Sequence, residues 1–202
     1  LTLGATYRTS SRLKGYVTDY KYASISSITD TLSHRIDTLS HGGKAKIASE
    51  YGFGISLKKG DKWRIEVDYT MSDWQNSSLG ETPGFSNIGS ANFSTTYSQS
   101  VKAGFEFVPN INDIRYYMRR CSYRAGVYYD RDYYKLGGNT VNSYGLTLGI
   151  TFPVFRWYNG VSVGVDLGQR GSLGNKMVRE RYAMIFIGFN IHDIWFQKPK
   201  YE

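Results

Sequence analysis

Seven charged residues at alternating positions of strand-like segments could together form a polar lining. Successive side chains of a β-strand point to opposite faces, so residues two apart share a face. Opposite charges on neighbouring strands favour ion pairs, which make an enclosed charge tolerable. We predict that the lumen-facing set comprises Arg64, Glu66, Asp68, Lys102, Glu106, Arg124 and Asp166. The set either guides a solute or braces the wall as a structural network, and we favour the network.

A short repeat, Asp-Thr-Leu-Ser-His, occurs at residues 30–34 and again at 37–41. If this segment is helical, each Asp and its His are i,i+4 neighbours, a spacing that can offer metal ligands. His34 and His41 would then stand two turns, roughly 10 Å, apart, which is too far to share one ion. We therefore favour a solvated loop and predict no metal site.

The remaining chemistry-bearing motifs do not indicate an enzyme. Ser, His and Asp co-occur, but a catalytic triad is defined by geometry rather than by composition. No phosphate-binding loop, paired-cysteine cluster or dinucleotide fingerprint is present in the sequence. The single cysteine, Cys121, cannot form an internal disulfide, and we expect it to be inert. We predict no enzymatic activity and no cofactor.

The elements that must position these residues are β-strands with one apolar face and one polar or glycine-rich face. Alternate residues are apolar in Tyr51–Leu57, Trp63–Met71, Val101–Phe107, Tyr123–Tyr129 and Tyr144–Phe152. This period predicts an all-β, antiparallel transmembrane β-barrel with apolar residues toward lipid. We predict about eight strands, at residues 1–23 (with an irregularity around Ser10–Arg12), 47–58, 63–74, 97–108, 121–134, 143–154, 161–170 and 180–192.

A soluble β-sandwich is the alternative, because its strands alternate as well. The strands here are long and continuous for a sandwich, and their polar face is rich in glycine, so we favour the barrel. The apolar runs are far shorter than the roughly 20 residues that a membrane-spanning helix needs. The 202 residues form one domain, and alternation begins at residue 1, so we expect further barrel sequence before it.

The connections alternate between short and long, as they do in barrels with short periplasmic turns and long external loops. Lys59–Lys62 and Phe155–Gly160 are short, whereas Ser24–Lys46 and Gln75–Thr96 are long and predicted to be external. Tryptophans expected at the membrane interfaces stand at or beside the predicted strand ends, namely Trp63, Trp74, Trp157 and Trp195.

The link at residues 109–120 is an exception, because it is long although the alternation places it on the periplasmic side. It carries Arg115, Tyr116, Tyr117, Arg119 and Arg120. We predict a contact site for a protein partner here, with binding to lipid headgroups as the alternative. The formal net charge is +8, but the cations are spread along strands and turns, which argues against a nucleic-acid partner.

Several segments resemble the FadL-type family of outer-membrane transporters. In Ile47–Gln75 a Lys/Asp turn joins two alternating strands, and the second ends in Asp68, Tyr69 and Trp74 at the spacing common in that family. Leu3–Arg8 with Leu13–Gly15 and Tyr123–Tyr129 resemble other strands of the family. The ending, with Gly168–Gly171, Val178–Tyr182 and Trp195-Phe196, is similar to members from Bacteroidetes-type bacteria.

This resemblance covers the carboxy-terminal half of the family's pattern. It implies the last part of an about fourteen-stranded barrel, whose amino-terminal hatch and early strands are not in this sequence. The implied function is passive, porin-like uptake of small hydrophobic compounds across the outer membrane of a Gram-negative bacterium. The alternative is a non-transporting accessory barrel subunit of a larger outer-membrane complex. The expected partners are outer-membrane lipids and lipopolysaccharide, with other outer-membrane or periplasmic proteins.

Overall fold

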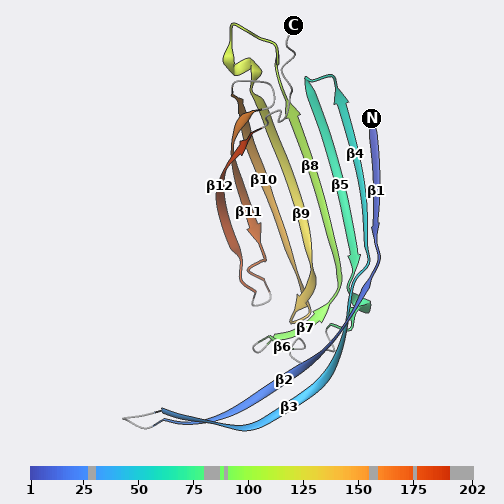
Figure 1. Cartoon of the computed structure of the whole chain (residues 1–202), viewed down its shortest axis with the longest axis vertical. Helices are drawn as coiled ribbons and strands as arrows, with labels where there is room; N and C mark the ends of the chain where they lie inside the picture. The colour runs from blue at the N-terminus through green and yellow to red at the C-terminus, as the bar shows by residue number, and fades with distance from the viewer. Residues whose placement is uncertain (27–30, 80–86, 89–90, 155–158, 175–176, 192–202) are drawn as a thin grey trace, which may run out of the picture.

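The computed structural model describes residues 1–26, 31–79, 87–88, 91–154, 159–174 and 177–191 (Figure 1). Its strands are β1 (Thr2–Arg8), β2 (Ser11–Ser26), β3 (Thr31–Ile47), β4 (Glu50–Lys59), β5 (Trp63–Asp73), β6 (Asn87–Ile88), β7 (Ala91–Thr95), β8 (Tyr97–Phe107), β9 (Ser122–Leu136), β10 (Asn139–Pro153), β11 (Gly160–Arg170) and β12 (Glu180–Asn190). Helical structure in these ranges consists of two 3-10 turns, η1 (Gln75–Ser77) and η2 (Tyr117–Arg120). No helix in the described ranges has the length and apolarity to cross a membrane.

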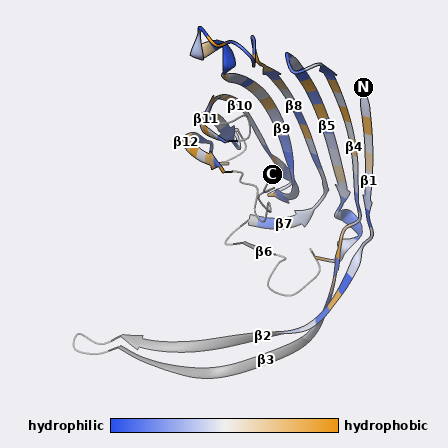
Figure 2. Cartoon of the chain, turned by 45° about the horizontal axis from the view of Figure 1, so that its top comes forward, coloured by the Kyte–Doolittle hydropathy of each residue, from blue (hydrophilic) through white to orange (hydrophobic). Residues whose placement is uncertain are grey.

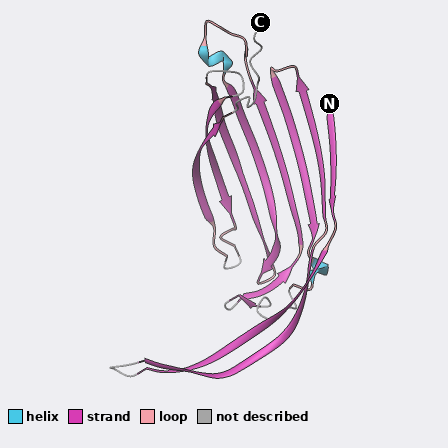
Figure 3. Ribbon diagram, viewed as in Figure 1, coloured by secondary structure: helices cyan, strands magenta, loops and turns pink. Residues whose placement is uncertain are grey.

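Ten strands form one antiparallel sheet, and Figure 3 shows how strand dominates the molecule. The main path runs β1-β4-β5-β8-β9-β10-β11-β12, with β7 pairing to β9 and β6 pairing to β7. The sheet is strongly curved (Figure 2). Among the described strands, β1 and β12 do not pair with each other. The all-β antiparallel prediction is therefore confirmed, whereas closure into a barrel is not observed.

The amino-terminal part differs most from the prediction. The predicted strand 1–23 is two strands, β1 and β2, because the chain leaves the sheet after Arg8 and pairs as a separate hairpin of β2 with β3. The predicted external loop Ser24–Lys46 is wrong over most of its length, since β3 spans Thr31–Ile47. Pairing along the hairpin satisfies backbone groups that an irregular loop would leave to water. The second long link contains η1, β6 and β7.

The register keeps the apolar side chains on one face across the main path. One row across neighbouring strands comprises Ile55, Val67, Ala103, Val127, Leu146 and Leu167. The apolar residues become even-numbered in β10, because the tight turn at Gly137 and Gly138 pairs odd-numbered with even-numbered residues. Both glycines have positive φ, 57° and 83°, as a type I′ hairpin turn requires.

The apolar face is exposed along the sheet. Ile55, Val127 and Leu148 keep 50%, 53% and 50% of their surface accessible. In the described part of the chain, no second sheet covers them, and the buried hydrophobic residues are Ala48, Phe93, Cys121 and Val141. A sandwich would bury this face between two sheets, so the structure does not support that alternative. The apolar face instead needs a non-aqueous environment outside the sheet.

We expect Val127→Arg to destabilise the protein in lipid vesicles by about 2–4 kcal/mol, because it would place a cation on the exposed apolar face of β9, the face that hydrocarbon would surround. Val127→Leu is the matched control and should unfold at nearly the wild-type urea concentration. The measurement is the urea midpoint in phospholipid vesicles. Equal midpoints for the two variants would show that this face does not lie in the hydrocarbon layer.

Candidate functional site

The polar face of the sheet is concave and carries all seven predicted lining residues. Together they line one open hollow of about 610 Å³. Three come from β5, and Asp166 comes from β11, four strands further along the main path. A flat sheet would hold those strands roughly 19 Å apart. The shared hollow therefore indicates that the sheet curves toward the polar face, and Figure 2 shows the curvature of the sheet. A role as a lumen lining stays a prediction.

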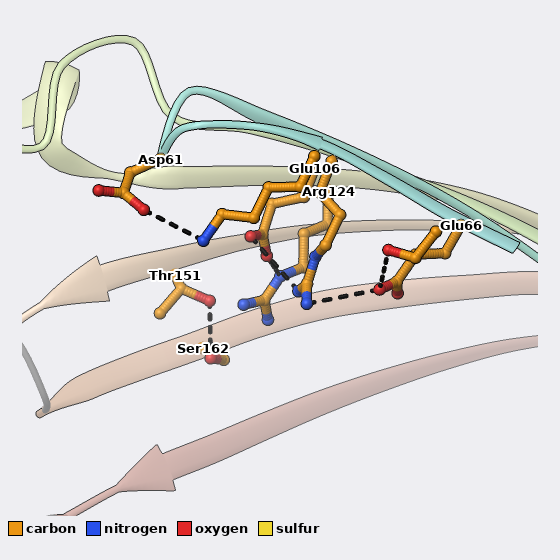
Figure 4. A network of polar contacts seen from close by, with 9 residues as sticks. Asp61, Glu66, Glu106, Arg124, Thr151 and Ser162 are labelled. Atoms are coloured by element: carbon orange, nitrogen blue, oxygen red, sulfur yellow. Dashed lines mark hydrogen bonds and ion pairs between the residues drawn. The ribbon is translucent and has the colours of Figure 1, made fainter. Parts of the chain in front are cut away.

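Glu106 joins two arginines across three strands. The register places Arg64 opposite Glu106, and Glu106 opposite Arg124. The carboxylate lies 3.5 Å from Nη2 of Arg64 and 2.5 Å from Nε of Arg124 (Figure 4). Nη1 of Arg64 also lies 3.5 Å from the carboxylate of Glu66. This row ties β5, β8 and β9 together, in the way a bracing network would.

The rest of the predicted set is less tightly paired. Lys102 stands opposite Asp68 in the register, but the structure shows no ion pair between these two residues. Asp166 accepts a hydrogen bond from the Tyr128 hydroxyl at 3.0 Å. Near the rim, Thr151 and Ser162 share a hydrogen bond of 2.8 Å (Figure 4).

Two tyrosines bridge β9 and β12 above a pair of glycines. One register row places Tyr128, Gly145, Gly168 and Tyr182 on successive strands. The two hydroxyl oxygens lie 2.5 Å apart. The rings occupy the space that a side chain at either glycine would need. Because the contact spans two intervening strands, it holds this part of the sheet in its curved shape.

The described contacts of the concave face are ion pairs and hydrogen bonds. Within the described ranges, no three potential metal ligands lie together. The helical geometry considered for the 30–41 repeat is wrong, because β3 is extended. Residues four apart in a strand are separated by roughly 13 Å. The side chains of His34, Asp37 and His41, and the whole of Asp30, lie outside the described part of the chain.

Two of the four predicted interfacial tryptophans are described, and they mark the two ends of β5. Trp63 is the first residue of the strand, and Trp74 follows its last residue. The Trp74 ring packs on Tyr133, with 4.8 Å between the ring centroids. Trp157 and Trp195 lie outside the described residues, so the complete interfacial belt stays a prediction.

The link between β8 and β9 folds around a single carboxylate. Oδ1 of Asp113 accepts the backbone N–H groups of Tyr116 at 2.8 Å and Arg115 at 2.9 Å. Oδ2 lies 3.3 Å from Nη1 of Arg119. These groups favour the ionised form, the N–H of Tyr116 most of all, and hold the pKa of Asp113 below its ordinary value despite its burial. The carboxylate thereby fixes the shape of the link.

The link is also fastened to the rim of the sheet. The hydroxyl of Tyr117 donates to the carbonyl oxygen of Pro153 in β10 at 2.8 Å. The hydroxyl of Tyr123 donates to the carbonyl oxygen of Met118 at 3.0 Å.

Cys121 is fully buried, and burial raises the pKa of its thiol against the opposing effect of Arg120. A protonated, enclosed thiol is a poor nucleophile.

The five residues predicted as a partner contact lie together on this link. The guanidinium groups of Arg115 and Arg119 lie over the ring of Tyr116, at 5.4 Å and 4.7 Å from its centroid. The guanidinium group of Arg120 lies over Tyr117 at 4.9 Å. These cation–π contacts order side chains that would otherwise be mobile.

These features define an antiparallel β-sheet protein with the two-faced wall typical of outer-membrane proteins. The chain belongs to the BamG family, whose model matches residues 1–202. That family is related to the outer-membrane BAM complex, so membership points to the outer membrane or its complexes. No curated protein and no solved structure matches the chain.

The family match overturns the resemblance to FadL-type transporters, for which no match is found. The resemblance rested on alternating strands, a Lys/Asp turn and tryptophans at strand ends. Any sheet that separates lipid from a polar interior needs these features, so they do not distinguish one outer-membrane family from another. The fourteen strands, the hatch and the uptake of hydrophobic compounds were inferred from that resemblance and lose their support with it.

We expect Gly145→Ala to destabilise the sheet by about 1–3 kcal/mol. Its Cβ would lie 2.8 Å from the carbonyl oxygen of Leu167 and would displace the Tyr128 ring. Gly104→Ala is the matched control, since nothing lies within 4 Å of a Cβ there. Urea midpoints in vesicles measure both variants. The importance of the tyrosine bridge is refuted if Gly145→Ala unfolds at the same midpoint as Gly104→Ala.

The lowered pKa of Asp113 predicts a pH dependence for the link. Because the folded value is below the unfolded one, the stabilisation is present above the ordinary pKa of 3.8 and is lost as the pH falls through the lowered value. A carboxyl ¹³C titration of Asp113 in detergent micelles should give a midpoint below 3.8. An ordinary midpoint for Asp113 would contradict the hydrogen bonding described.

Proposed function

We propose that the protein is a non-transporting, structural subunit of a larger outer-membrane protein complex. The observation that carries this proposal is the match to the BamG family along the whole chain. The structure adds a physical reason to assign the protein to a complex. A subunit of this kind needs a wall that remains in the membrane and surfaces that other proteins can hold.

The concave face supports a bracing role over a conducting one. Glu106, held between Arg64 and Arg124, and the bridge of Tyr128 with Tyr182 extend across this face. Such contacts stiffen a wall and reduce the open space beside it. Selective uptake would instead favour groups that stay available to a moving solute, because a bound solute must also leave.

The β2–β3 hairpin supports a role within an assembly. It extends away from the sheet (Figure 1) and, among the described strands, each of its strands pairs only with the other. A two-stranded hairpin is at best marginally stable alone in water. A neighbouring protein that covers the hairpin would supply the missing stabilisation.

The exposed apolar face gives the proposed location its physical basis. Outer-membrane lipids, including the lipid part of lipopolysaccharide, would contact residues such as Ile55, Val127 and Leu148. Cations near the strand ends would meet lipid phosphates. The protein would therefore have lipid on its convex side and protein partners at the ends of its strands.

We expect the affinity-tagged full-length protein, extracted in mild detergent, to migrate in native gels as part of a stable complex containing other outer-membrane proteins. Mass spectrometry of the excised band should give those partners in constant ratio to the tagged chain. An abundant porin tagged in the same way is the control for non-specific association. A monodisperse single chain carrying a lipid-like ligand would contradict the subunit role.

A further inference from the structure

We propose that the 109–120 link is a docking surface for an acidic face of a protein partner, on the side of the sheet where the short turns lie. This inference rests on the proposed function, since it names the kind of partner that a subunit of the complex would meet.

The link has a fixed shape before any partner binds. Asp113 organises its turn, Tyr117 fastens it to Pro153, and the N–H of Asn110 donates to the carbonyl oxygen of Arg119 at 2.8 Å. A surface ordered in advance loses little conformational entropy on association. The β4–β5 turn beside it is short by comparison.

The outward side of the link has the composition of an interface core. Ile114 is completely exposed, and Tyr116 and Met118 keep 48% and 52% of their surface accessible. Interface cores are enriched in aromatic residues, Met and Arg, and binding energy concentrates in Tyr and Arg anchors. A fully exposed isoleucine close to a half-exposed tyrosine gains most when another protein removes it from water.

The charge of this end of the sheet fits an acidic partner. The link carries three arginines and one aspartate. The β4–β5 turn lies beside it, because the N–H of Val108 donates to the carbonyl oxygen of Lys62 at 2.7 Å, and this turn adds Lys58, Lys59 and Lys62 against Asp61. In the described part of the chain, Arg115 contacts the ring of Tyr116 and has no acidic partner. Its charge remains available for carboxylates of another protein.

The position of the link favours a protein over lipid headgroups. Its inner side, with Ile111, Tyr117 and Arg120, lines a second hollow of about 790 Å³ together with Glu106 and Arg124 of the polar face. The link thus bends over the concave side of the sheet instead of the apolar side that would meet lipid. Headgroups surround the outer circumference of a barrel wall, whereas a protein can cover its open end.

The test uses charge reversal in the full complex. Arg115→Glu should lower recovery of the partner proteins by at least about tenfold in a pull-down, a loss typical of an interface anchor. The matched control is Arg181→Glu, the same change at an exposed position at the start of β12, away from both the link and the β2–β3 hairpin. It should leave recovery unchanged. Urea midpoints of both variants must equal the wild type, which separates lost docking from misfolding.

A photo-crosslinking amino acid at position 114 identifies the contacted molecule. A crosslink to a partner segment rich in Asp and Glu, together with restored binding of Arg115→Glu when those acids are changed to Lys, supports the proposal. Crosslinks to lipid, or full recovery of partners with Arg115→Glu, overturn it while the complex itself remains. Absence of any complex in the wild type would instead refute the proposed function.

Discussion

Antiparallel pairing in one fixed register is the constraint on which the rest of this structure depends. Because the side-chain period of a strand is two, a slip of one residue in any strand would exchange its apolar and polar faces. A slip in β8, for example, would turn Ala103 toward the concave side and Glu106 outward. Register therefore decides which surface can meet lipid and which can hold ions.

Because the sheet is curved, the charged residues that the register places on one face line a common hollow. Ion pairs along the Glu106 row connect adjacent strands, and they would form in a flat sheet as well. The bridge between Tyr128 and Tyr182 is different, because it joins strands that are not neighbours. It requires the absence of side chains at Gly145 and Gly168, which lie between the two rings in the same row. Glycine on this face is thus a condition for the curved shape.

The two ends of the sheet differ in what they present to other molecules. One end carries the paired strands β2 and β3, which extend beyond the sheet. The other end carries short turns and the rigid basic link with its exposed Ile114. A wall with one exposed apolar face and two different ends suits a protein that lies in a membrane beside other proteins. This arrangement agrees with membership of the BamG family.

The local period of the sequence determined the strands β4, β5 and β8 to β12 and the polarity of each of their faces, since both depend only on neighbouring residues along the chain. Seven charged residues could be assigned to a single face for that reason, and the structure places all of them on one hollow. The sequence also contained the link residues, although it could not show that Asp113 organises them. Family identity was not determined in this way, because the resemblance to FadL-type proteins rested on features that all lipid-facing sheets share.

Only the tertiary structure decided which distant residues meet. The departure of β2 and β3 from the sheet, the tyrosine bridge and the joint position of the Lys62 turn and the 109–120 link all depend on pairing between segments far apart in the chain. Alternation gives the same pattern for a strand inside a sheet and for one in a separate hairpin. The choice between them depends on the free energy of long-range pairing, which no local sequence pattern contains.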